Sequence, residues 1–190
     1  FSVTVGSLEI LLEGFSCMLY CYARLLKKLK IKSKPVAYTN QEGTSSFVMT
    51  SEISFLDKGT VTSPKGFLAG ASFAGIKTYS PDKLDLGILY SEKQCTSAGV
   101  FTTNQVKSAS VLLTQQHLLS NKLQSVVVTS GIANACVGNQ GMIDALEMVS
   151  LASGHVGIET DQIAICTTGI IGVELPMALL RNSIPKMTKC

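Results

Sequence analysis

The second half of the chain alternates apolar runs with turn residues in an order that predicts a strand, a helix and another strand. Leu123–Thr129 contains three consecutive valines, which is typical of a strand buried on both faces. Ile163–Cys166 is a second short apolar run and predicts another buried strand. Between these runs, apolar residues recur at helical spacing at Met142, Ala145, Leu146, Val149 and Ala152.

The predicted helix also has a polar side and an end signal. Asp144 and Glu147 are expected to face away from the apolar side. Gly154 or Gly157 is expected to end the helix, because glycine accepts the left-handed conformation that often follows a last helical turn. Taken alone, this strand–helix–strand order predicts a doubly wound α/β sheet.

Shorter apolar runs upstream predict further strands. We expect strands within Gly66–Lys77, Leu84–Tyr90 and Gly99–Thr103, because each run is short and bounded by turn residues. Pro176 is expected in the first turn of a last helix, where its missing N–H has no consequence.

Residues 1–59 differ from the rest of the chain in the distribution of apolar, basic and turn residues, and they predict an N-terminal extension. Residues 14–23 form an apolar run of about half the ~20 residues that a membrane span needs, so no membrane segment is expected. Residues 24–34 are rich in lysine without an acidic residue and predict a solvated helix or a poorly ordered extension, with an organelle transit remnant as the alternative. Residues 35–59 predict a linker. The domain is therefore expected to span residues 60–190.

Composition and charge narrow the classes of function. Of the 190 residues, 46% are apolar and 15% charged, which is typical of a globular protein. The net charge of +3 is small, so nucleic acid is not an expected partner. The six cysteines lack zinc-like spacing and are expected to be free buried thiols. His117 and His155 are expected at the surface or at helix ends.

Three loops at predicted strand ends carry polar residues that could serve chemistry. Gly99–Asn104 reads GVFTTN, and Thr129–Gly141 combines small residues with Asn134 and Asn139. A Thr-Thr-Gly turn is expected directly after Ile163–Cys166. Each loop also has an ordinary explanation, because Gly, Asn, Ser and Thr are common in turns. The sequence has no GxxxxGK[ST], GxGxxG, HExxH or GxSxG motif.

Five short segments occur in the order and at the spacings of one enzyme family. They are VTSPKGF, AGIK, GVFTTN, SGIANACVGNQG and TTGIIGVELPM. Together they span about residues 60–185, and through them the chain resembles the ornithine acetyltransferase family, the bifunctional glutamate N-acetyltransferases of arginine biosynthesis. The match covers less than half of a full-length member, and residues 1–59 match no part of it.

The resemblance implies a cytoplasmic acyltransferase, or a mitochondrial or plastid one if the basic segment is a transit remnant. It implies transfer of acetyl from N2-acetylornithine to glutamate through an acetyl-threonine intermediate, without a metal or a bound cofactor, and with acetyl-CoA as a possible co-substrate. It also implies autocatalytic cleavage of a precursor into α and β chains that assemble as α2β2. The implied fold is α/β, a mixed sheet with flanking helices of the self-processing DmpA/ArgJ-like type.

The resemblance also assigns roles to single residues. Thr168 and Gly169 match the Thr-Gly pair that forms the oxyanion hole, where fixed donors stabilise the charge of a tetrahedral intermediate. Thr168 would donate through its hydroxyl, and Gly169 would allow close approach to its backbone N–H. Thr167 should point elsewhere, because side chains alternate along a strand. The nucleophilic threonine is expected beyond Cys190, so the chain alone is expected to be inactive.

Two positions depart from the family, because Thr129 and Ile132 stand where members typically have asparagine. Three interpretations therefore remain. The chain is the N-terminal part of the α chain of an ornithine acetyltransferase, a relative among the self-processing aminopeptidases and amidohydrolases, or a non-catalytic product that lacks the nucleophile. A peptide-cleavage assay on the complete protein separates the second from the first, and the sequence that follows Cys190 separates the third.

Overall fold

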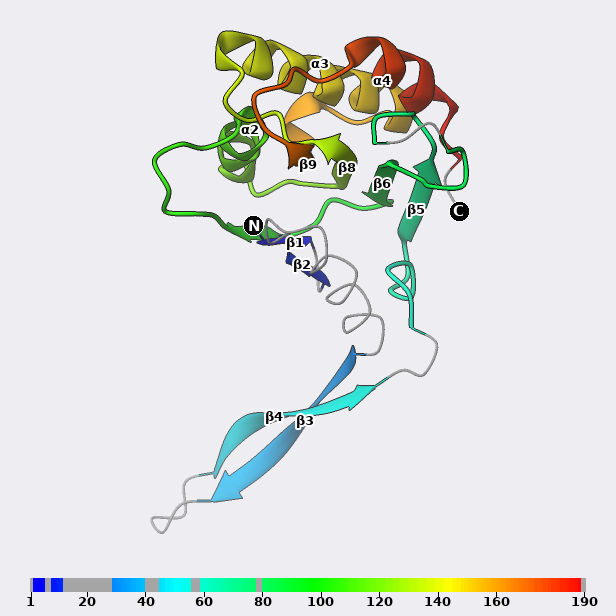
Figure 1. Ribbon diagram of the computed structural model, residues 1–190. Helices are drawn as coiled ribbons and strands as arrows, with labels where there is room; N and C mark the ends of the chain where they lie inside the picture. Colours follow the sequence, from blue (N-terminus) through cyan, green and yellow to red (C-terminus); the bar gives the residue numbers. More distant parts are fainter. Residues whose placement is uncertain are drawn as a thin grey trace.

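The centre of the protein is a four-stranded mixed sheet (Figure 1). The computed structural model describes the backbone of residues 2–5, 8–11, 29–39 and 45–55, and all of residues 59–77 and 80–188. The sheet consists of β5 (Phe67–Ser72), β6 (Leu86–Ser91), β8 (Ser125–Ile132) and β9 (Ile163–Ile170), in the order β5-β6-β8-β9.

The strand directions decide between the two expected sheet types. β5 and β6 are antiparallel, β6 and β8 are antiparallel, and β8 and β9 are parallel. The mixed sheet with flanking helices is therefore confirmed, and the doubly wound alternative is wrong. The strand–helix–strand unit is present between β8 and β9, but antiparallel pairing at β6 excludes an all-parallel sheet.

The helices lie over one face of this sheet and along its β9 edge in Figure 1. They are α2 (Ala109–Leu118), α3 (Gly138–Val156) and α4 (Met177–Ser183), followed by short 3₁₀ turns at Thr160–Gln162 and Ile184–Lys186. The main core lies between them and the sheet, and includes Val127, Met148, Ile165 and Leu180. A smaller cluster of Leu123, Val126, Ala164 and Cys166 covers the opposite face of β8 and β9.

Helix α3 ends at one of the two expected glycines, but it begins at Gly138, inside the loop expected at Thr129–Gly141, and its buried face differs from the expected one. Gly157 ends it in the left-handed conformation, with its N–H donating to the Ser153 carbonyl at 2.8 Å, as expected. Asp144, expected to face away, is only 3% exposed, whereas Leu146 is 51% exposed. The expectation was wrong at these two positions because α3 packs against α2, α4 and the Ile184–Lys186 turn as well as the sheet, so the pattern along α3 alone did not locate the buried face.

The expected element ends differ most in β9. Thr167, Thr168 and Gly169 lie inside this strand and pair with β8, so the Thr-Thr-Gly turn was wrong. The pairing extends because the glycines of β8 and β9 allow their backbones to come close. Pro176 directly precedes α4 instead of lying in its first turn. β7 spans Ser97–Val100, so only Gly99 and Val100 of the expected Gly99–Thr103 strand lie in a strand.

The N-terminal residues that are described form strands. β1 (Ser2–Val5) lies between β2 (Leu8–Leu11) and β7, and β3 (Leu29–Thr39) pairs with β4 (Ser45–Phe55) as a separate hairpin. The expected linker is therefore wrong where β3 and β4 occupy it, and the basic segment is a strand from residue 29 onward.

Other expectations for the N-terminal extension stay predictions. The apolar run 14–23 and the start of the basic segment lie outside the described residues, and a domain start near residue 60 stays a prediction. Among the described residues, no helix is long and apolar enough to cross a membrane.

Candidate functional site

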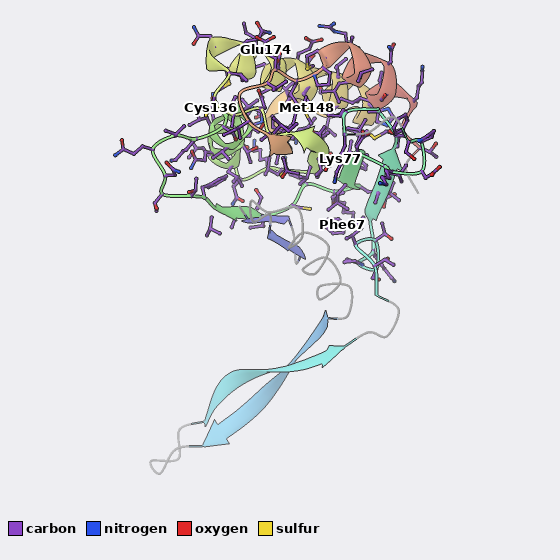
Figure 2. The ribbon with its side chains drawn as sticks, in the orientation of Figure 1. Phe67, Lys77, Cys136, Met148 and Glu174 are labelled. Carbon is purple, nitrogen blue, oxygen red and sulfur yellow. The ribbon has the colours of Figure 1, made fainter. Side chains whose placement is uncertain are left out.

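The candidate site lies where β8 and β9 end side by side. Their register places Ser130 next to Thr168 and Gly131 next to Gly169. Parallel strands carry their carboxyl ends to the same edge of a sheet, so two segments distant in sequence, SGIANAC and TTGIIG, meet here. The AGIK segment meets them too, because the backbone of Ile76 lies against Gly131. Figure 2 marks Lys77, the last residue of AGIK, in the loop after β5.

The two adjacent threonines of β9 differ in their hydrogen bonds. The Thr167 hydroxyl donates to the Ala133 carbonyl at 2.8 Å and lies 2.8 Å from the Ser110 hydroxyl of α2. Thr168 points to the opposite face of the strand. Its half-buried hydroxyl makes no hydrogen bond with any residue between 59 and 188 that the structure describes. The structural role expected of Thr167 is confirmed, and Thr168 has a hydroxyl available to a ligand.

Helix α2 covers the outer edge of β9 along the first half of this strand. The Thr114 hydroxyl accepts from the Ile165 N–H and donates to the Ile165 carbonyl, both at 3.0 Å. His117, in the last turn of α2, lies with its Nδ1 2.7 Å from the Ile163 carbonyl, so its expected place at a helix end is confirmed. These contacts occupy backbone groups that an edge strand otherwise leaves unpaired.

Farther along the same edge, Gly169 has no such partner. Backbone groups alternate in direction along a strand, and those of Ile163 and Ile165 face the outer edge. Gly169 is in step with them, so its N–H also faces outward. No residue in the described part of the chain bonds that N–H. A backbone donor and the Thr168 hydroxyl therefore remain unused on consecutive residues.

Glycine is required at two paired positions by close packing of the backbone. Gly131 has φ +134° and Gly169 has φ +137°, conformations that L side chains rarely adopt. A Cβ on Gly169 would overlap the Gly131 carbonyl group and lie 2.6 Å from the Ile132 nitrogen. A Cβ on Gly131 would lie 3.0 Å from the Ile76 carbonyl carbon. Glycine at position 169 is therefore required by packing against β8, and the expected close approach of a ligand to the Gly169 N–H stays a prediction.

The loop that follows β8 is ordered by one asparagine. Asn134 is fully buried with φ +48°, and its Nδ2 donates to the Gly141 carbonyl at 2.8 Å. Its backbone carbonyl accepts from the Ala109 N–H at the start of α2. Asn139, singled out with it, is exposed in the first turn of α3. Asn134 therefore joins the starts of α2 and α3 to the candidate site.

The two departures from the family pattern lie within or beside the core. Thr129 is fully buried, and its hydroxyl has no partner among the described residues. Ile132 is half-buried and packs against the main core. Neither side chain supplies the amide that asparagine would place there.

Three residues near the site were not identified from the sequence. Ser130 presents a half-buried hydroxyl that, like that of Thr168, has no hydrogen-bond partner in the described regions. Ser110 supports Thr167, and the buried carboxylate of Asp85 binds the AGIK backbone. No local pattern marks these residues, because each acts on a segment distant in sequence.

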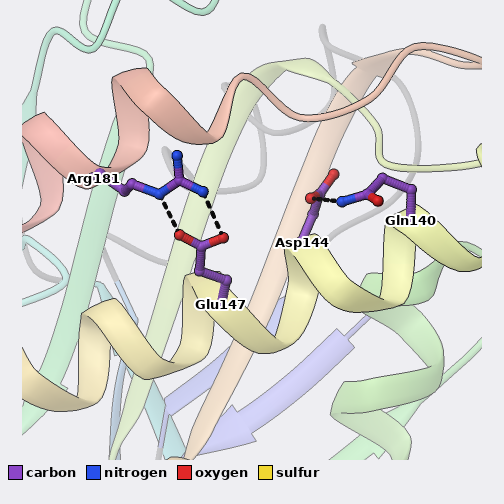
Figure 3. Close-up of polar contacts among 4 residues, drawn as sticks. All are labelled: Gln140, Asp144, Glu147 and Arg181. Carbon is purple, nitrogen blue, oxygen red and sulfur yellow. Dashed lines mark hydrogen bonds and ion pairs between the residues drawn. The ribbon is translucent and has the colours of Figure 1, made fainter.

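The charged groups on α3 and α4 lie outside this site (Figure 3). Arg181 binds both carboxylate oxygens of Glu147, at 2.5 and 2.9 Å, and this hydrogen bonding lowers the pKa of Glu147 below its ordinary value. Asp144 accepts from the Gln140 amide at 2.8 Å. The Arg181–Glu147 pair joins α4 to α3, whereas the Gln140–Asp144 bond lies within α3, and neither contact has an evident part in chemistry.

The other reactive side chains offer no alternative centre. Burial raises the pKa of the Cys166 thiol, which keeps it in the unreactive protonated form. Cys136 is exposed and Cys95 half-buried, so the expectation of buried free thiols holds only for Cys166 among the described cysteines. Within residues 59–77 and 80–188, no cluster of His, Cys, Asp or Glu has the makeup of a metal site.

Comparisons with known proteins identify the same family that the five sequence segments resemble. The chain is 42% identical over 136 residues to the arginine biosynthesis bifunctional protein ArgJ of Dehalococcoides mccartyi, covering 72% of this chain and 34% of that protein. It is 48% identical over 119 residues to ArgJ of Symbiobacterium thermophilum, covering 63% of this chain and 30% of that protein. The chain thus spans about a third of the length of these curated relatives.

Solved structures give the same result. The crystal structure of ArgJ from Bacillus halodurans matches with a TM-score of 0.67 at 38% identity, over 70% of this chain and 69% of that one. Ornithine acetyltransferase from Mycobacterium tuberculosis, in complex with ornithine, matches with a TM-score of 0.62 at 37% identity, over 67% of this chain and 70% of that one. The ArgJ family model matches residues 68–190, which include the whole candidate site, and the chain therefore belongs to the ArgJ family.

Proposed function

We propose that this chain supplies the oxyanion-binding part of an acyltransferase of arginine biosynthesis. The reaction is transfer of acetyl from N2-acetylornithine to glutamate, which gives ornithine and N-acetylglutamate. One observation carries the assignment: the Thr168 hydroxyl and the Gly169 N–H are unused by the described residues, whereas the adjacent Thr167 hydroxyl is fully occupied. Membership of the ArgJ family and the ornithine-bound relative support the choice of substrates.

The chemistry needs fixed donors at the place where negative charge develops. A threonine hydroxyl from the remaining part of the enzyme attacks the acetyl carbonyl carbon, and the carbonyl oxygen becomes an oxyanion. Thr168 and Gly169 donate hydrogen bonds to this oxygen, and their positions on a paired strand keep them oriented before the reaction. The C–N bond then breaks, and ornithine leaves with the proton on its amine.

The second half of the reaction uses the same donors. The amine of glutamate attacks the acetyl-threonine ester, so that a C–N bond forms, the C–O bond breaks and the threonine hydroxyl is restored. Acetyl-CoA is an alternative acetyl donor in this scheme, and neither a metal nor a bound cofactor takes part. The nucleophilic threonine belongs to the β chain of the same precursor, in an α2β2 assembly in the cytoplasm.

The test is a transfer assay on the full-length protein that carries this chain. Purified protein is incubated with N2-acetylornithine and isotopically labelled glutamate, and labelled N-acetylglutamate and free ornithine are measured together. Equal amounts of both products are expected, with an acetylated threonine peptide trapped when glutamate is omitted. Release of acetate without transfer, or cleavage of amino-terminal residues from peptides, would assign the protein to the amidohydrolases and aminopeptidases instead.

A further inference from the structure

We propose that Asp85 is a positioning residue for the candidate site, a role that rests on the proposed function of Thr168 and Gly169. Asp85 directly precedes β6, and the residue is 3% exposed. A carboxylate is costly to bury unless hydrogen bonds satisfy it. Its partners therefore indicate what it holds in place.

Among the described residues, all the hydrogen bonds of this carboxylate come from one loop. Oδ1 accepts from the Ala74 N–H at 2.7 Å, and Oδ2 accepts from the N–H groups of Ile76 at 2.6 Å and Lys77 at 3.0 Å. These donors belong to AGIK, a segment singled out in the sequence but given no task by the proposed reaction. Hydrogen bonds to an ionised acceptor are roughly twice as strong as neutral ones, so Asp85 fixes the backbone of this loop.

The loop in turn lies against the end of β8. The Ile76 carbonyl carbon, carbonyl oxygen and Cγ2 each lie 3.0 Å from the point where a Cβ of Gly131 would be. The backbone carbonyl of Asp85 also accepts from the Ser130 N–H at 2.8 Å. One residue thus holds the end of β8 directly through Ser130 and indirectly through Ile76.

The last step leads from β8 to the proposed donors. Gly131 is the register partner of Gly169, and their backbones are too close for a Cβ between them. Ser130 is likewise the register partner of Thr168. Packed backbone without intervening side chains transmits displacement because protein interiors have few voids. Displacement of AGIK should therefore move Gly169 and Thr168, although Asp85 touches neither of them.

The variant that tests this is Asp85→Asn in the full-length protein. Asparagine keeps the shape but replaces one acceptor oxygen with an NH2 group, which faces backbone donors. The matched control is Asp82→Asn, an exposed carboxylate three residues earlier that bonds only the Ser80 hydroxyl among the described residues, at 3.3 Å. Both variants change the charge of the protein equally, so electrostatic effects at a distance cancel in the comparison.

Kinetics give the first measurement. We expect kcat of Asp85→Asn to fall on the order of 10- to 100-fold, because a misplacement of catalytic donors by about 1 Å lowers the rate by up to about 100-fold. KM should change far less. Asp82→Asn should keep both constants. A folded Asp85→Asn enzyme with parental kcat overturns the proposal, as does an equal loss in both variants.

A second measurement does not depend on activity. Amide resonances of glycine are easily identified by nuclear magnetic resonance, and those of Gly131 and Gly169 should shift in Asp85→Asn but not in Asp82→Asn. A shift confined to residues 74–77 means that the displacement stops at the loop, and the proposal is then wrong. A parent enzyme without acetyl transfer overturns the proposed function instead, while these resonances still decide the role of Asp85.

A milder variant tests the same proposal in the event that Asp85→Asn does not fold. Ile76→Ala removes the Cγ2 contact with Gly131 and leaves the three hydrogen bonds of Asp85 intact. It should lower kcat several-fold and shift the Gly131 resonance without unfolding the protein. Parental kcat together with an unshifted Gly131 resonance would count against transmission through the loop.

Discussion

The two halves of β9 differ in how completely their polar groups are used. In the first half, Ile163 and Ile165 are fully buried and α2 bonds their edge-facing backbone groups. In the second half, the Thr168 hydroxyl and the Gly169 N–H have no partner in the described part of the chain, and Ile170 is 64% exposed. The same strand therefore serves stability at one end and leaves donors for a ligand at the other.

The largest effect is expected where the second half touches the backbone of β8. Gly169→Ala adds a Cβ that overlaps Gly131 and imposes φ +137° on a residue with a side chain. We expect a loss of about 2–5 kcal/mol in the free energy of unfolding, together with loss of activity. Urea unfolding of the chain measures the first, and the transfer assay on the full-length protein measures the second.

A control separates backbone strain from overlap at this position. Gly172 also has positive φ, +75°, but a Cβ there meets nothing within 4 Å. Gly172→Ala should cost only about 1–2 kcal/mol, from the left-handed conformation alone. Equal losses in both variants would show that the contact between Gly131 and Gly169 is unimportant.

The adjacent threonines give the sharpest contrast between structure and chemistry. Thr168→Val removes an unused hydroxyl, so we expect a fall in kcat of about 10²-fold or more with little change in KM. Thr167→Val leaves the Ala133 carbonyl and the Ser110 hydroxyl without this partner, and should lower stability by about 1–2 kcal/mol with a much smaller effect on kcat.

These two variants need one check before rates are compared. The proposed function includes cleavage of a precursor, and autocatalytic cleavage would also pass through an oxyanion, so the extent of processing must be determined on a gel. A fully processed Thr168→Val enzyme with the parental rate would leave the oxyanion assignment without support, whatever Thr167→Val does.

The first half of β9 should respond in stability alone. Thr114→Val keeps the volume but removes the partner of both backbone groups of Ile165. We expect a loss of about 1–3 kcal/mol in the free energy of unfolding, because two buried polar groups become unsatisfied. The KM and kcat of the folded variant should equal those of the parent. A selective loss of kcat would show that the two halves are not functionally separate.

The smallest effect is expected far from β9, at the exposed ion pair between α3 and α4. Arg181 lowers the pKa of Glu147, so any stability from this pair is present at neutral pH and is lost as the carboxyl protonates in acid. Arg181→Met should lower the melting temperature only slightly at pH 7, and less still at pH 3. A large decrease at pH 7 would show that the contact between the helices depends on this pair.

Patterns along the sequence predicted helices and strands better than they predicted which side of each is buried. The valine-rich β8, the helical spacing of α3 and its end at Gly157 were predictable, because each depends on neighbouring residues. The buried side of α3 was not, since the burial of Asp144 and the exposure of Leu146 depend on which distant elements pack around the helix. The Thr-Thr-Gly segment had the composition of a turn, yet it continues a strand because glycines lie opposite each other in register.

The sequence alone determined the family, because the order of its motifs is read directly along the chain. It also determined the main helices and strands and the difference between Thr167 and Thr168, because strand alternation depends only on neighbouring residues. Only the tertiary structure decided which polar groups are used. Thr114 is 51 residues from Ile165 and Asp85 is 11 residues from Ala74, and no spacing rule connects such pairs. Hydrogen-bond partners depend on distances of a few ångströms between segments, and folding sets those distances by packing the whole core.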